Sequence, residues 1–71
     1  MHWIVKLPDG RECCVWASNP EEAAQYADTV LDPPQPGQKV TLQVKRRTVV
    51  DAPWHEVVLH GQCAWTAYLL K

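Results

Sequence analysis

Cysteine and histidine are the residues of this chain best suited to binding a metal ion. His60 and Cys63 are separated by two residues around an expected turn, and Cys13 is followed directly by Cys14. A structural zinc site uses four converging ligands, usually as two closely spaced pairs. Neighbouring residues of a strand point to opposite faces, so Cys13 and Cys14 cannot both face one ion. We therefore expect no metal ligands, and a zinc-stabilised module built on His60 and Cys63 is only an alternative.

Catalytic groupings are equally sparse. Nucleophilic catalysis needs a thiol or hydroxyl beside an oriented base, and only Cys63 with His60 or His55 offers such a pairing. The adjacent carboxylates of Glu21 and Glu22 are explained by the start of a helix. The three glycines are isolated, so no phosphate-binding loop is present. We predict that the protein is not an enzyme, has no catalytic residues and uses no cofactor.

One basic run could contact phosphate groups. Lys45, Arg46 and Arg47 are consecutive, and Trp54 follows after a short interval, which would suit phosphate contacts beside a stacked base. Solvated charges at a strand end also protect a sheet edge from aggregation. Seven basic against eight acidic residues give a formal net charge of −1, so no long-range field attracts nucleic acid. Nucleic-acid binding by these four residues is therefore an alternative, not the expected function.

The first half of the chain predicts a β-hairpin followed by a helix. Apolar residues alternate over residues 2–7 and 11–17, and Pro8-Asp9-Gly10 between them suits a tight hairpin turn. Asn19 is placed to cap a helix, with Pro20 at its first position and Glu22 able to complete a capping box.

The predicted helix extends to about Leu31, where Asp32-Pro33-Pro34 ends it. Residues 32–37 then form a proline-rich connector inside a single domain that spans residues 1–71.

The second half predicts strands only. Residues 39–45 alternate cleanly, and residues 48–50 continue this strand past a bulge or begin another. Residues 55–60 and 63–70 form a second hairpin, closed by a tight turn at Gly61-Gln62. The order is β-β-α-β-β(-β). The expected fold is a small α+β domain with one helix packed on one face of a four- or five-stranded antiparallel sheet.

A single helix can cover only one face of such a sheet, so the other face should be polar. Several large apolar residues nevertheless fall opposite the expected core positions: Ile4, Trp16, Tyr68 and Leu70. One interpretation is a curled sheet whose second face is partly covered by the proline-rich connector. The interpretation we favour is an exposed apolar patch that binds a partner protein or a second copy of the chain.

Composition further limits the class of protein and its location. The 71 residues are 46% hydrophobic and include four tryptophans, which is typical of a globular domain. No apolar run approaches the ~18 residues of a membrane-spanning helix, and the first residues already alternate as a strand does, unlike a secretory leader. Three cysteines, an odd number, do not suit a closed disulfide framework. We expect a reduced cytoplasmic protein that makes no membrane contact.

Part of the chain resembles a known family. From Trp3 to Tyr26, a strand, a turn, a strand and a Glu-Glu-Ala helix resemble the first half of HicB-type antitoxins. The similarity covers a third of the chain and the later residues depart from it, so no functional site is carried over. The whole layout is similar to that of some small phage-encoded inhibitors, including certain anti-CRISPR proteins. We expect a small non-enzymatic interaction module, such as a phage or mobile-element accessory regulator or inhibitor, that occludes a partner protein or forms a homodimer.

Overall fold

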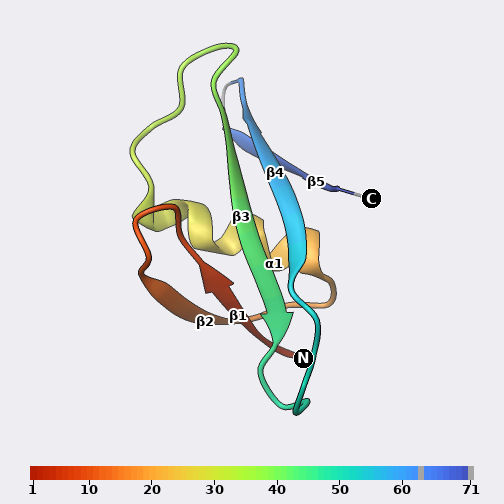
Figure 1. Ribbon diagram of the computed structural model, residues 1–71. Coiled ribbons are helices and arrows are strands. Elements are labelled where there is room, and N and C mark those ends of the chain that lie inside the picture. Colours follow the sequence, from red (N-terminus) through yellow and green to blue (C-terminus); the bar gives the residue numbers. More distant parts are fainter. Residues whose placement is uncertain (63, 71) are drawn as a thin grey trace.

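The computed structural model describes residues 1–62 and 64–70, which form one antiparallel sheet with a helix packed on one face (Figure 1). The sheet has five strands in the order β2-β1-β3-β4-β5. Their bounds are β1 (His2–Lys6), β2 (Glu12–Trp16), β3 (Lys39–Arg46), β4 (His55–Gly61) and β5 (Trp65–Leu69). This confirms the predicted α+β class and the five-stranded form of the sheet.

The turn between β1 and β2 forms as its residue types predict. The Leu7 N–H donates to the Arg11 carbonyl oxygen at 2.7 Å, and the Gly10 N–H donates to the Leu7 carbonyl oxygen at 3.0 Å. Gly10 has a φ of 94°, a left-handed conformation that glycine adopts without a steric penalty. Asp9 accepts hydrogen bonds from both the backbone N–H and the side chain of Arg11. Because its carboxylate is stabilised by these bonds, the pKa of Asp9 is lowered.

Helix α1 (Pro20–Tyr26) begins at the predicted cap but ends earlier than predicted. The Asn19 side chain accepts a hydrogen bond from the Glu22 N–H at 2.7 Å. The Glu22 carboxylate accepts from the Tyr26 hydroxyl at 2.7 Å, an interaction not anticipated from the capping-box pattern. This bond raises the pKa of Tyr26. Within the described residues, no helix is long and apolar enough to cross a membrane.

After Tyr26 the chain tightens into a 3₁₀ helix, η1 (Ala27–Val30), so the prediction of one continuous helix to Leu31 was wrong. Leu31 already has the extended conformation, with a ψ of 153°. Short 3₁₀ turns are common at the C-terminal end of an α-helix. The chain leaves the helical conformation at Leu31, as Asp32-Pro33-Pro34 predicts, because a residue before proline is disfavoured in the helical region.

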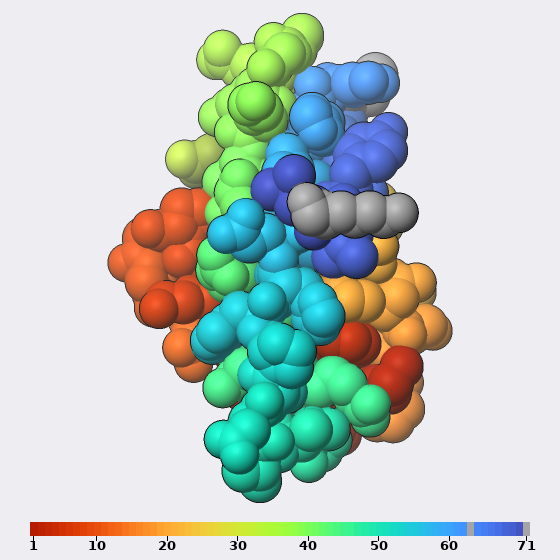
Figure 2. All heavy atoms as spheres, turned by 45° about the vertical axis from the view of Figure 1, so that its right-hand side comes forward, coloured from red at the N-terminus to blue at the C-terminus, as the bar shows by residue number. Residues whose placement is uncertain are grey.

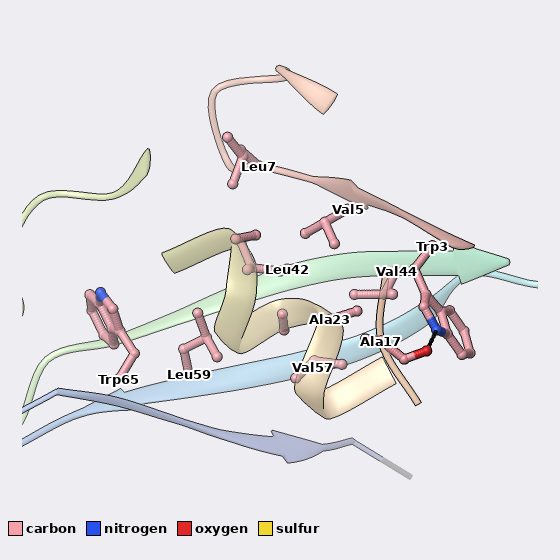
Figure 3. Close-up of a cluster of buried hydrophobic side chains, with 12 residues drawn as sticks. Trp3, Val5, Leu7, Ala17, Ala23, Leu42, Val44, Val57, Leu59 and Trp65 are labelled. Atoms are coloured by element: carbon pink, nitrogen blue, oxygen red, sulfur yellow. Dashed lines mark hydrogen bonds between the residues drawn. The ribbon is translucent and has the colours of Figure 1, made fainter. Parts of the chain in front are cut away.

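The core lies between α1 and the sheet. Figure 3 shows Trp3 and Trp65 at opposite ends of a row of aliphatic side chains from the sheet. Helix α1 presents the buried residues Ala23 and Ala24, whose small side chains let the helix approach the strands closely. The Trp3 indole Nε1–H donates to the Ala17 carbonyl oxygen at 2.9 Å. Among the described residues, the buried Trp65 Nε1–H has no such acceptor.

The proline-rich connector crosses the end of β4 on the side of the helix. A Cβ atom added to Gly61 would lie 2.5 Å from the Pro34 Cβ and 2.9 Å from the Gln35 carbonyl oxygen. Gly61 therefore permits a close approach inside β4 and is not part of the predicted tight turn at Gly61-Gln62. The predicted start of the next strand at Cys63 lies outside the described residues. Because Gly61 shares a sheet face with the buried Leu59, the connector covers the helix side of the sheet, contrary to the interpretation that placed it on the other face.

Residues 47–54 form a long loop, and no strand includes residues 48–50, which corrects the prediction that these residues continue the preceding strand or begin another. The loop contains a turn in which the Ala52 N–H donates to the Val49 carbonyl oxygen at 3.3 Å and Asp51 has a φ of 61°. This loop forms the lower end of the molecule in Figure 2. The described chain is elongated, with extents of 37 × 23 × 20 Å.

Candidate protein-interaction surface

The sheet face opposite α1, here called the open face, carries the four residues predicted to bind a partner. Strand register places Ile4 beside Cys14 and Trp16 beside His2 at one end of this face. The Trp16 side chain is 67% exposed, and its ring packs edge-on against His2 with 4.6 Å between ring centres. We call Ile4, Cys14 and Trp16 the N-terminal apolar cluster. The prediction that Trp16 lies outside the core is confirmed.

A second apolar group lies on β4 and β5. Tyr68 pairs with Val58 across these strands and is 57% exposed, and its ring packs edge-on against His60 at 5.2 Å. The Leu70 N–H donates to the Glu56 carbonyl oxygen at 2.8 Å, which extends the ladder by one residue and holds Leu70 on the open face. Val58, Tyr68 and Leu70 form the C-terminal apolar cluster.

Polar residues separate the two clusters. Lys6, Gln43 and Glu56 occupy one row across β1, β3 and β4, and the Gln43 side-chain amide donates to the Glu56 carboxylate at 3.3 Å. Strands lie about 4.8 Å apart, so Ile4 on β1 and Tyr68 on β5 are separated by roughly 14 Å across the sheet. The four predicted residues therefore share a face, but they form two patches and not one.

The predicted basic cluster is divided between the two faces of the sheet. Lys45 lies on the open face, where its Nζ stands 4.8 Å from the centre of the Trp54 ring. Arg46 pairs with the core residue Trp3, so its side chain leaves β3 on the side of the helix. Arg47 follows β3, and its N–H donates to the His2 carbonyl oxygen at 3.0 Å. The structure thus brings Lys45 and Trp54 together but directs Arg46 away from them.

A shallow depression on the open face was not anticipated from the sequence. It has a volume of about 360 Å³ and is lined by Lys6, Leu7, Pro8, Thr41, Gln43 and Trp54. Alternation along residues 39–45 placed Thr41 and Gln43 on one face, but only strand order shows that β3 lies beside β1 and brings Lys6 next to them. The depression joins the polar centre of the open face to the loop that carries Trp54.

The cysteines and histidines do not assemble into a metal centre among the described residues, where no three metal-ligating side chains converge. His60 packs against Tyr68, and Cys63 lies outside the described residues. Cys13 is half-buried and Cys14 is exposed. Burial, with a smaller effect of the neighbouring Cys14 thiol, raises the pKa of Cys13.

Comparison with known proteins returns no match among family models, curated proteins or solved structures.

Proposed function

We propose that this protein is a non-enzymatic interaction module that binds a partner protein with the open face of its sheet. The observation that carries the proposal is the exposure of large aromatic side chains on one face, with Trp16 67% and Tyr68 57% exposed. Tryptophan and tyrosine are enriched among the residues that dominate binding energy at protein interfaces. Both are held by edge-on contacts with histidines, so little conformational entropy is lost when a partner covers them.

The centre of the open face carries charges of both signs. The row between the two apolar clusters holds Glu12, Lys6 and Glu56, and Lys45 pairs with Ile4 at the border of the N-terminal apolar cluster. The Gln43 side-chain amide donates to the Glu56 carboxylate. A matching partner carries polar groups between two apolar contacts, and binding such a surface occludes it.

The experiment compares three variants in affinity capture from extracts of the source cells. Trp16→Ala and Tyr68→Ala each truncate one apolar cluster, and Val50→Ala is the control, since Val50 is 88% exposed but lies in the loop of residues 47–54. Truncating a central interface aromatic costs about 2 kcal/mol or more, which is roughly a thirtyfold loss of affinity. We expect one partner to be lost with both aromatic variants and kept with Val50→Ala.

Two results would contradict the proposal. If no captured protein depends on Trp16 or Tyr68, the open face is not a binding surface. If a partner depends on one aromatic residue only, it occupies one cluster and the spanning arrangement is wrong. Circular dichroism of each variant shows that the fold is retained, which is expected because both side chains lie outside the core.

A further inference from the structure

Strand β2 lies at one end of the sheet, and no strand of the described residues pairs with its outer backbone edge. Hydrogen bonds from the Leu7 N–H to Arg11 and from the Ala17 N–H to Met1 fix which residues of β2 bond to β1. In an antiparallel ladder this bonding alternates, so every second residue of β2 turns its N–H and C=O away from β1. The outward-facing residues are Glu12, Cys14 and Trp16.

Both faces of β2 leave apolar side chains incompletely covered. Helix α1 packs mainly on β4 and β5 and touches β2 least, so Cys13 and Val15 are only half-buried although they lie on the core side. On the open face, Cys14 and Trp16 are exposed. The only charged residue of β2 is Glu12, at its first position. Charges and prolines within an edge strand are the usual protection against pairing, and the central part of β2 has neither.

The opposite edge of the sheet differs in its helix cover. Hydrogen bonds from Leu70 to Glu56 and from Gln62 to Ala64 direct the backbone groups of Trp65, Ala67 and Leu69 outward from β5. Helix α1 packs on this strand, however, and Trp65 is only 7% exposed. A strand added at β5 would therefore bury less apolar side-chain surface on the helix side than a strand added at β2.

We propose that a second copy of the chain pairs antiparallel with β2 around a two-fold axis at Cys14, so that two sheets join into one continuous sheet. Among symmetric antiparallel registers, only this one pairs all three outward-facing residues. Cys14 meets Cys14 of the second copy, and Glu12 meets Trp16 of the second copy at each end. In this register the outward N–H and C=O groups of one β2 strand match those of the second β2 strand over its whole length. This match favours a second copy over an unrelated peptide.

Side chains also fit this register. The two Glu12 carboxylates are set four residues apart along the new ladder, about 14 Å, which exceeds the screening length of about 8 Å at physiological salt. On the helix side, Cys13 lies beside Val15 of the second copy, so both half-buried residues gain a neighbour. On the open face, the two N-terminal apolar clusters become adjacent. The inference goes beyond the proposed function, because edge pairing uses backbone groups that binding at the open face leaves free.

Sedimentation across a range of protein concentrations, under reducing conditions, tests the inference. The wild-type chain is expected to pass from monomer to dimer. Cys14→Pro removes an outward N–H and no bond to β1, and we expect it to raise the dimer dissociation constant by about ten- to a hundredfold. Ala67→Pro is the matched control, since it removes an outward N–H from β5, and we expect it to dimerise as the wild type does.

A wild-type chain that stays monomeric would overturn the inference, as would an unchanged dimer dissociation constant in Cys14→Pro or loss of the dimer in a folded Ala67→Pro. If circular dichroism shows Cys14→Pro to be unfolded, Cys14→Lys decides the question. It changes only an exposed side chain and sets two like charges opposite each other at the axis, so a dimer that persists in Cys14→Lys contradicts the register. A monomer that still captures a Trp16-dependent partner would refute this inference and leave the proposed function standing.

Discussion

Gly61→Ala tests the most specific packing relationship in the fold. The added Cβ would lie 2.5 Å from the Pro34 Cβ, 2.9 Å from the Gln35 carbonyl oxygen and 3.2 Å from the Gln38 carbonyl oxygen. Two of these contacts are backbone atoms, and the Gly61 N–H also donates to the Gln38 carbonyl oxygen at 2.7 Å. No flexible side chain near Gly61 can move aside for the added methyl group. The backbone of the connector must therefore shift to make room for it.

Whether Gly61→Ala raises or lowers the free energy of unfolding shows if the site around Gly61 is open or filled. In an uncrowded strand, replacing glycine by alanine stabilises a protein by about 0.5–1 kcal/mol, because glycine loses more backbone entropy on folding. Overpacking a filled site costs about 1–3 kcal/mol. A 71-residue domain has a total stability of roughly 4–11 kcal/mol, so the expected loss is a large share of it. It corresponds to a fall in Tm of about 4–24 °C.

Urea and thermal unfolding of the wild type, Gly61→Ala, Pro34→Gly and the double variant measure this effect. Pro34→Gly removes the nearest clashing atom, so Gly61→Ala should cost less in that background, and the difference is the coupling energy between the two sites. A Gly61→Ala variant as stable as the wild type, or more stable, would refute the close approach of the connector to β4.

Three further predictions concern caps, buried indoles and thiols. Asn19→Ala removes the helix cap and should lower the free energy of unfolding by about 1 kcal/mol, measured by urea denaturation; an unchanged value would mean that the cap contributes nothing. Trp3→Phe should lower the free energy of unfolding by about 1 kcal/mol or more beyond the loss in Trp65→Phe. Of the two, only Trp3 gives up an observed hydrogen bond, and its loss leaves the Ala17 carbonyl oxygen unpaired. Equal losses in thermal unfolding would contradict this prediction. Cys14 should react with iodoacetamide faster than Cys13 at pH 8, because Cys13 is half-buried and its pKa is raised. Fragment-ion mass spectrometry identifies which thiol is labelled first, and earlier labelling of Cys13 would refute the assignment of the two residues to opposite faces.

The local elements were predictable because each depends on a few neighbouring residues. The β1–β2 turn follows from Pro8-Asp9-Gly10, and the helix start follows from Asn19 and Pro20. Asp32-Pro33-Pro34 predicted where helical conformation ends, but helical spacing does not distinguish an α-helical turn from a 3₁₀ turn, so the change at Ala27 was not predicted. Residues 48–50 were predicted as strand because all three are β-branched, but such residues favour strands only where a partner strand is available.

The sequence predicted which residues lie on the candidate surface, but not how they are arranged on it. Alternation assigned Ile4, Trp16, Tyr68 and Leu70 to the face opposite the core, and the register confirms that assignment. Their division into two clusters depends on strand order. β3 and β4 lie between β1 and β5, and no local pattern in the sequence specifies which strands become neighbours across a long connection.

By itself, the sequence determined the periodicities, the β1–β2 turn and the side of each strand that avoids water, because these follow from chain geometry and hydrophobicity over a few residues. Only the tertiary structure decided that the connector packs against Gly61, that Lys45 meets Trp54 while Arg46 faces the other way, and that β2 ends the sheet with its backbone edge open. Those features arise from contacts between residues distant in sequence, whose free energy is set when the whole sheet and helix pack together.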